Sequence, residues 1–333
     1  MITSDLPRVT ISVKAYRQEK TVAEAVESVF AQTYPNLEIL LSDDCSPDGT
    51  FEVMTDMAAS YRGPHTVRLN RNPTNLGIVA HTNRIWELAT GMLIVGCAGD
   101  DVAEPDKVAR LVETWMQDPD HIVIVHSKTT VIDQDGNVLR ERLPSARSIG
   151  DPSPLDMAHP HANGIGAATM YHRQRILDTF GPLSDVCMVE DGPLFFRAAT
   201  IGRIAYVDAS LVRYRIGGVS NPSPVSTARD YLFGIRVKSV AWSVATARAM
   251  LQDMEKVDFP EKAACRTLFR DHIAEDGFLA DLFTGGTWRR IALVPEGLRR
   301  SIAARESRPL RLALQYALGP LYIAYHDWRH GRG

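Results

Sequence analysis

The chain has 333 residues, of which 45% are hydrophobic and 23% charged, and its formal net charge is -3. This composition is typical of a globular protein with a sizeable core, and it gives no general attraction to nucleic acid. The four cysteines are far apart without a CxxC spacing, so zinc and dithiol redox sites are not indicated. The first residues, MITSDLPRVT, lack the apolar region of a signal peptide, and the longest late apolar run is far shorter than a bilayer-spanning helix. We therefore expect a cytoplasmic protein with reduced thiols.

The beginning of the chain predicts a strand, a helix and a second strand. Apolar and polar residues alternate over residues 9–13, as in a half-buried strand. Thr21 and Glu24 have the spacing of a capping box, apolar residues then recur with helical spacing, and Pro35 is expected to end the helix. An apolar strand over residues 37–42 completes a right-handed βαβ unit.

The same alternation continues along the chain. We expect strands over residues 65–70, 92–99 and 121–127, a helix over residues 78–91, and a further helix that begins at Pro105. This order predicts an α/β fold with an open, mostly parallel sheet and helices on both of its faces.

The later part of the chain has a different character. Residues 143–160 are rich in Pro, Ser and Asp without periodicity, and we interpret them as a mobile loop over the site. Helical patterns dominate after about residue 225, so we predict two parts, residues 1–224 and residues 225–333. From Trp288 to the end there are nine arginines, no lysine and three acidic residues, a net charge of +6. Arginines mixed with apolar residues suit the surface of an anionic membrane, and a helical cap with a solvated basic face is the alternative.

Two predicted strands end in paired aspartates, Asp43-Asp44 and Asp100-Asp101. Ligands of open α/β sheets bind at the carboxyl ends of the strands, so we expect both pairs to converge on one crevice. Adjacent carboxylates repel unless they are hydrogen-bonded or bridged by a cation, which favours a divalent metal and a diphosphate at Asp100-Asp101. The alternatives are a helix cap at Asp100-Asp101 and an Asx-type turn at Asp43-Asp44.

A third acidic pair, Glu190-Asp191, stands at the start of a predicted helix. Acidic residues are favoured there by the helix dipole, which is a purely structural explanation. The functional alternative is a general base that removes a proton from an acceptor hydroxyl.

Three blocks of the sequence resemble family 2 glycosyltransferases of the GT-A fold. The first is VTISVKAYRQEKTVAEAVESVFAQTYPNLEILLSDDCSPDGT, the second combines NLGIVAHTNRIWELATG with CAGDDVAEPDKV, and the third is VEDGPLFFRAATIGRIAYVDASLVRYR. They occur in the family's order over roughly residues 7–220. The resemblance implies the GT-A fold with a C-terminal helical region, and an inverting transfer without a covalent enzyme intermediate.

The resemblance also implies a role for each matching residue. Those that would bind the nucleotide-sugar are Tyr16, Glu19, Asp43, Asp44, Gly77, Asn83 and Asp100, with Asp44 reading a uracil or thymine base. Asp101 would coordinate a divalent cation, Mn²⁺ or Mg²⁺. Asp191 would be the catalytic base, with Glu190 as its neighbour.

This sequence departs from the family pattern in three places. In YRIGGVS the histidine that often follows the closing arginine is missing, so metal coordination from that side is not expected. Ala98 replaces the usual first aspartate of the DxDD run, so that only Asp100 and Asp101 remain, and we expect weaker metal binding. Lys14 and Arg17 flank the early tyrosine, and we interpret them as solvated surface charges rather than contacts to a diphosphate or an acidic sugar.

The sequence thus predicts an enzyme that moves a sugar from a UDP- or dTDP-sugar to a hydroxyl of a glycan or lipid-linked acceptor, in cell-envelope polysaccharide synthesis. The alternatives are a non-catalytic nucleotide-sugar-binding relative and a nucleotidyltransferase on a related scaffold. If the C-terminal helices bind anionic lipid, we expect the enzyme to act at the cytoplasmic face of the membrane.

Overall fold

The computed structural model describes residues 6–159, 162, 164–217, 236–304 and 308–318. The chain divides into two compact units. The first comprises Met1–Ser223 and Ala249–Leu268, and the second comprises Pro224–Arg248 and Phe269–Gly333.

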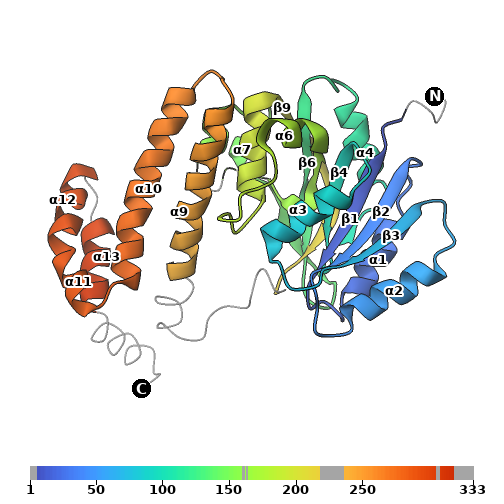
Figure 1. Cartoon of the computed structure of the whole chain (residues 1–333), viewed down its shortest axis with the longest axis horizontal. Helices are drawn as coiled ribbons and strands as arrows, with labels where there is room; N and C mark the ends of the chain where they lie inside the picture. Colours follow the sequence, from blue (N-terminus) through green and yellow to red (C-terminus); the bar gives the residue numbers. More distant parts are fainter. Residues whose placement is uncertain (1–5, 160–161, 163, 218–235, 305–307, 319–333) are drawn as a thin grey trace. The chain divides into compact units, whose positions relative to one another are not determined.

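The first unit is built on one sheet, which contains nine strands within the described residues (Figure 1). The strands are β1 (Val9–Ala15), β2 (Leu37–Asp43), β3 (Thr66–Arg71), β4 (Leu93–Ala98), β5 (Val102–Ala103), β6 (Ile122–Ile132), β7 (Val138–Arg142), β8 (Thr169–His172) and β9 (Arg203–Arg215). Their order is β3-β2-β1-β4-β8-β6-β9-β5, with β7 paired to β6. The strands β3, β2, β1 and β4 run parallel, whereas β8 is antiparallel to both β4 and β6.

Helices follow most of the strands. They are α1 (Val22–Phe30), α2 (Thr50–Ser60), α3 (Ile78–Leu88), α4 (Lys107–Trp115), α5 (Pro154–Ala158), α6 (Arg173–Phe180) and α7 (Asp191–Ile201). Of these, α1, α3, α4 and α7 lie where the sequence predicts helices, whereas α2, α5 and α6 were not predicted. Val9, Ile11 and Val13 of β1 are fully buried in one core cluster with the apolar faces of α1 and α4. Because side chains alternate along a strand, the intervening Ser12 and Lys14 point to the opposite face of the sheet.

Three local expectations are wrong. The capping box at Thr21 does not form: the Thr21 side chain accepts no hydrogen bond from the first turn of α1, and its hydroxyl donates to the backbone oxygen of Gly99, at 3.0 Å. The first helix ends at Phe30, before Pro35, and α4 begins two residues after Pro105.

The segment over residues 143–160 is not an aperiodic loop. It contains the short helix α5, which begins with a capping box between Ser153 and Asp156. Met157 and Ala158 of α5 are buried. The short apolar stretch before residue 160 is therefore a packed element, which the high content of Pro and Ser concealed.

The C-terminal part is helical, as predicted. Its helices are α9 (Arg236–Asp253), α10 (Lys262–Thr284), α11 (Thr287–Ala292), α12 (Val294–Ala304) and α13 (Arg308–Ala317). Both α9 and α10 contribute residues to both units. In the second unit, α10 and α13 share a small core that includes Phe278, Leu282 and Tyr316. Within the ranges described, no helix is long and apolar enough to cross a membrane.

Candidate active site

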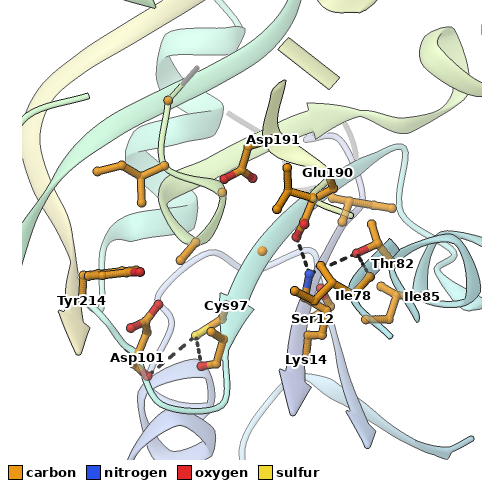
Figure 2. A pocket seen from close by; sticks show the side chains of 18 of the residues that line it. Ser12, Lys14, Ile78, Thr82, Ile85, Cys97, Asp101, Glu190, Asp191 and Tyr214 are labelled. Atoms are coloured by element: carbon orange, nitrogen blue, oxygen red, sulfur yellow. Dashed lines mark hydrogen bonds and ion pairs between the residues drawn. The ribbon is translucent and has the colours of Figure 1, made fainter. Parts of the chain in front are cut away.

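A cavity of about 260 Å³ lies at the carboxyl ends of β1 and β4. Its charged lining includes Lys14, Asp100, Asp101, Arg142, Glu190 and Asp191. In Figure 2, Asp101 and Tyr214 lie on one side of the cavity and Thr82 and Ile85 on the other. The structure thus brings two of the three predicted acidic pairs together, whereas Asp43 and Asp44 do not line this cavity.

Asp101 lies three residues after β4 and is 1% exposed. Its Oδ1 accepts a hydrogen bond from the backbone N of Arg215 at 2.9 Å. Its Oδ2 is buried and has no hydrogen-bond partner among the described residues. Burial, and then the charge of Asp100, raise the pKa of Asp101 to about 7. A buried oxygen without a partner is unusual, and here it faces a cavity where a ligand can supply one.

Arg215 holds the turn that carries both aspartates. Its Nε donates to the backbone oxygen of Asp100 at 2.9 Å, and its guanidinium forms an ion pair with Glu24. It also donates to the backbone oxygens of Asp133 and Gln134 at 3.0 and 2.8 Å. Sequence reasoning missed this role because the partners of Arg215 lie far away in the chain.

Asp191 is the first residue of α7. Its Oδ1 is buried without a hydrogen-bond partner in the described part of the chain. Gly166 approaches it so closely that a β-carbon at Gly166 would overlap the Asp191 carboxylate. Burial, and then the charge of Glu190, raise the pKa of Asp191 to about 7. A carboxyl group that titrates near neutral pH is well suited to accept a proton in catalysis.

Lys14 is part of this site, so its interpretation as a solvated surface charge is wrong. Its Nζ forms an ion pair with Glu190 and donates to Thr82 Oγ1 at 3.0 Å (Figure 2). The signal that could have revealed it is the alternation of β1, because Lys14 falls on the strand face opposite Val13. Arg17, by contrast, is exposed.

A buried ammonium, that of Lys107, bonds two residues of the cavity lining. Lys107 is fully buried, and its Nζ donates to the backbone oxygens of Gly96 at 2.7 Å and Ala167 at 2.6 Å. It thereby joins β4 to the turn that contains Gly166. Burial lowers the pKa of Lys107. The sequence shows it only as a lysine near the start of a helix, without any sign of burial.

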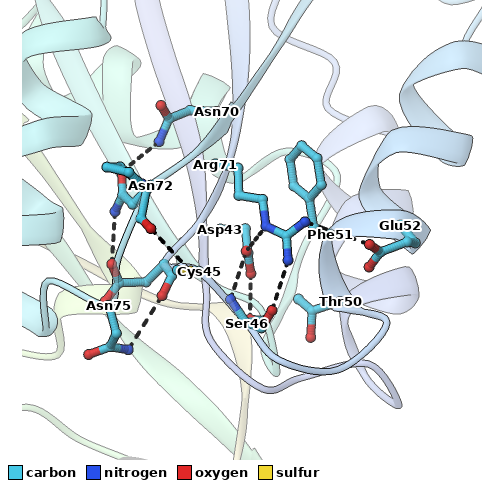
Figure 3. A network of polar contacts seen from close by, with 12 residues as sticks. Asp43, Cys45, Ser46, Thr50, Phe51, Glu52, Asn70, Arg71, Asn72 and Asn75 are labelled. Carbon is cyan, nitrogen blue, oxygen red and sulfur yellow. Dashed lines mark hydrogen bonds and ion pairs between the residues drawn. The ribbon is translucent and has the colours of Figure 1, made fainter.

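Asp43 is fully buried in a network of its own (Figure 3). Its carboxylate accepts hydrogen bonds from the backbone N of Ser46, at 2.9 Å, and from the Ser46 hydroxyl, and Arg71 Nε lies 3.5 Å from it. Asp43 thus stabilises the turn that follows β2, as in the structural alternative for this pair, although an Asx turn would bond the amide two residues on rather than three.

Asp44 is 3% exposed, and its carboxylate also has protein partners. Its Oδ1 accepts from Asn72 Nδ2 at 2.8 Å and from the backbone N of Leu76 at 2.9 Å. Its Oδ2 accepts from the backbone N of Gly77 at 2.9 Å. Gly77 has a φ of 79°, a conformation that glycine adopts most readily, and it immediately precedes α3. Asp44 therefore anchors the loop that leads into α3.

The other predicted nucleotide contacts lie outside the cavity lining. Tyr16 follows β1 and is partly exposed, and the exposed Glu19 accepts from the backbone N of Gly49 at 3.2 Å. Asn83 exchanges two hydrogen bonds of 2.9 Å with the backbone of Leu183. Asn83 thus fixes α3 to the segment that precedes Glu190.

The carboxylate oxygens at the cavity are suited to a divalent cation whose other ligands come from a bound phosphate group. Across the described ranges, no three His, Cys, Asp or Glu side chains are grouped to hold a metal ion. Mg²⁺ and Mn²⁺ are commonly held by one or two carboxylates, with substrate phosphates and water completing the shell. The unpartnered Oδ2 of Asp101, with Asp100 beside it, matches this smaller set.

The sheet and the position of this cavity define a GT-A type of α/β protein. Residues 10–177 match the model of Glycosyl transferase family 2, and the chain belongs to this family. The chain is 31% identical over 158 residues to the putative glycosyltransferase EpsE of Bacillus subtilis, a match that covers 47% of this chain and 55% of EpsE. The chain thus belongs to the family that its sequence blocks resemble, and it spans little more than half the length of EpsE.

Solved structures agree with this fold. The chain resembles S. aureus TarS 1-349 in complex with UDP-GlcNAc, with a TM-score of 0.62, 15% identity, and coverage of 94% of this chain and 92% of that chain. It also resembles the mannosyltransferase PcManGT of Pyrobaculum calidifontis in complex with GDP-Man and Mn²⁺, with a TM-score of 0.54 and 18% identity over 95% of this chain and 88% of that one. The predicted GT-A fold with a helical C-terminal region is confirmed.

Proposed function

We propose that this glycosyltransferase is an inverting, metal-dependent enzyme that uses a UDP- or dTDP-sugar and transfers the sugar to a hydroxyl of a glycan or lipid-linked acceptor. One observation carries the proposal. Asp101 and Asp191 each present a buried carboxylate oxygen without a hydrogen-bond partner among the described residues, and both line one cavity. Asp101 can bind a cation beside the departing diphosphate, and Asp191 can accept the proton of the attacking hydroxyl.

Asp191 is the proposed catalytic base. An acceptor hydroxyl is a weak nucleophile until its proton is removed, and the free Oδ1 of Asp191 can accept that proton. The oxygen then attacks the anomeric carbon, the bond to the diphosphate breaks, and the configuration inverts in a single displacement. The close approach of Gly166 confines the Asp191 carboxylate, which favours one orientation of its free oxygen.

Asp101 and Asp100 are the proposed metal and diphosphate residues. A divalent cation bound there would neutralise the charge of the departing nucleoside diphosphate. Arg215 binds the backbone oxygen of Asp100 through its Nε and the Asp101 carboxylate through its backbone N, so the two carboxylates need little rearrangement when a donor binds. The replacement of a third carboxylate by Ala98 is consistent with a cation that binds together with the donor.

We propose that the nucleoside lies toward the ends of β1 and β2. Tyr16 and Glu19 would contact the nucleoside, with Asp43, Gly77 and Asn83 shaping the loops around it. Asp44 Oδ2 has one protein donor and could accept a second hydrogen bond from a base N–H. TarS was solved with UDP-GlcNAc, which supports a uridine nucleotide, and PcManGT was solved with GDP-Man and Mn²⁺, which supports the cation.

The C-terminal helices supply a surface that supports an anionic membrane as the place of action. Trp288 of α11 is 84% exposed and Ile302 of α12 is 70% exposed. Their neighbours in the sequence include arginines that are ion-paired: Arg289 with Asp281, and both Arg299 and Arg300 with Glu296. Exposed aromatic and aliphatic side chains beside arginine favour binding at the interface of anionic lipid. A lipid-linked acceptor in cell-envelope polysaccharide synthesis, on the cytoplasmic face of the membrane, would be consistent with this surface.

A two-stage experiment tests the proposed function. A thermal-shift screen of UDP-, dTDP- and GDP-sugars, with and without Mn²⁺, should reveal stabilisation by a uridine or thymidine donor that increases with Mn²⁺. The donor so found is then used to measure release of nucleoside diphosphate with candidate glycan acceptors. The variant Asp191→Asn should bind the donor as the unchanged protein does but release diphosphate about 10²- to 10⁴-fold more slowly. Unchanged turnover by this variant would exclude Asp191 as the base.

A further inference from the structure

Lys14 and Glu190 form an ion pair directly beside the proposed base. The Lys14 side chain is 25% exposed and that of Glu190 is 18% exposed, so both charges are largely withdrawn from water. The Lys14 ammonium also donates to Thr82 Oγ1 at 3.0 Å, which fixes it between β1 and α3 (Figure 2). Because both partners hold the Lys14 ammonium, its charge has a fixed position beside Glu190, unlike that of a mobile surface lysine.

The partners of this pair come from distant parts of the chain. Lys14 lies on β1, where alternation directs it away from the core that contains Val13. Glu190 immediately precedes α7, and its side chain reaches Lys14 rather than capping the helix. The ion pair therefore joins the central strand to the helix that begins with Asp191.

We propose that Lys14 is a positioning residue of the transferase site, which holds Glu190 and keeps the neighbouring Asp191 able to ionise as the catalytic base. The inference rests on the proposed role of Asp191. Lys14 lies on β1 and belongs to none of the three acidic pairs, so this role is additional to theirs.

The charges around Asp191 determine in which direction Lys14 changes the pKa of Asp191. Glu190 on the same helix disfavours the ionised form of Asp191, whereas Lys14 on β1 and Arg142 at the end of β7 favour it. Tyr171 on β8 also faces this region, and its own pKa is raised well above 10 by burial, so its hydroxyl is neutral. Loss of the Lys14 charge would leave Glu190 unpaired and make Asp191 harder to ionise.

The test is a direct titration of Asp191 in the full chain, without metal or substrate. Aspartate labelled with ¹³C at its carboxyl carbon is followed by NMR as a function of pH, and the Asp191 signal is identified by its absence in Asp191→Asn. In Lys14→Met the midpoint should rise by about one pH unit, and in Lys14→Arg it should stay close to that of the unchanged protein. In Glu190→Gln the midpoint should fall, and in the double variant Lys14→Met/Glu190→Gln it should return toward the original value.

The matched control is Arg84→Met. It removes one positive charge from an exposed ion pair with Glu87 on α3, the helix that also carries Thr82. Its Asp191 midpoint should not move. The inference is overturned if Lys14→Met leaves the midpoint unchanged, or if Arg84→Met shifts it as much as Lys14→Met does. If Lys14→Met does not fold, the polar replacement Lys14→Gln, which also removes the charge, decides the same question.

The titration separates this inference from the proposed function. Diphosphate release by Asp191→Asn at the original rate would remove Asp191 as the base, whatever the NMR midpoints are. An unchanged midpoint in Lys14→Met would refute the positioning role and leave the evidence for Asp191 as base intact.

Discussion

Arg197 and Asp253 form a buried ion pair that connects α7 to the C-terminal end of α9. Arg197 Nε lies 2.7 Å from Asp253 Oδ2, and the two side chains are 2% and 6% exposed. Arg197 also donates to the backbone oxygens of Gly181 and Pro182 at 2.9 and 3.1 Å. The helix that begins with the proposed base Asp191 is thus anchored by a residue from beyond the predicted domain boundary at residue 224.

We predict that Arg197→Met lowers the free energy of unfolding by about 3 to 5 kcal/mol, because it leaves the Asp253 carboxylate buried without its main partner. Chemical denaturation measures this change. The control Arg84→Met breaks an exposed ion pair and should cost less than about 1 kcal/mol. A loss for Arg197→Met as small as that of the control would refute the prediction.

A chain that ends at residue 224 also lacks Asp253, so we expect it to be less stable than its apolar core suggests.

The proposed base gives a pH dependence with a definite sign. The Asp191 carboxyl must be ionised to accept a proton, and its pKa is raised to about 7 by burial and by Glu190. We expect kcat/KM to fall about tenfold for each pH unit below that value, and to be independent of this group above it. Initial rates of diphosphate release between pH 5 and 9 test this, with the donor found in the thermal-shift screen. An acid limb centred near pH 4 would contradict the raised pKa.

The Asp101 carboxylate should lower the stability of the metal-free protein and be required for metal binding. Its Oδ2 is buried without a partner among the described residues, and a neutral amide costs less to bury than a carboxylate. We predict that Asp101→Asn stabilises the metal-free protein by about 1 kcal/mol at pH 8 and abolishes the additional stabilisation that Mn²⁺ gives with the donor. Denaturation in EDTA and the thermal-shift assay measure the two effects. The control Asp106→Asn removes an exposed charge and should change neither.

Gly166 should be needed for activity more than for stability. A β-carbon at this position would overlap the Asp191 carboxylate and displace it from its single orientation. We expect Gly166→Ala to reduce the rate of transfer at least about 10²-fold while the donor still binds. Gly277→Ala is the matched control, since nothing lies near a β-carbon at this helical glycine and alanine favours the helix. Full activity of Gly166→Ala would mean that the carboxylate has room to move.

The exposed side chains of the C-terminal helices predict binding to anionic membranes. Flotation with vesicles of mixed neutral and anionic lipid should recover the full chain with the lipid, and less of the variant Trp288→Ser/Ile302→Ser. High salt should weaken the binding, because arginine contributes by charge. Vesicles of neutral lipid alone are the control. Equal recovery of both proteins in the unbound fraction would exclude this surface as a membrane contact.

Some of this protein could be predicted from the sequence because the signals are local. The period of the apolar residues determines the strands and helices, and paired aspartates directly after apolar runs indicate the edge of the sheet where ligands bind. The strand ends near Asp43 and Asp100 and the helix start at Asp191 were located in this way. The capping box expected at Thr21 does not form, and the Thr21 hydroxyl instead bonds a residue distant in sequence, Gly99, which no local pattern indicates.

The tertiary structure alone decided which of these groups share a cavity and which charges surround them. The burial of Lys107 and Arg215 depends on strands and turns that meet only in the folded chain, and no local pattern distinguishes these two residues from surface cations. The two aspartates Asp44 and Asp101 look alike in sequence, yet folding supplies hydrogen-bond donors to both oxygens of Asp44 and leaves one oxygen of Asp101 without any among the described residues. Ionisation and ligand binding depend on burial and on partners distant in sequence, which only the packed fold determines.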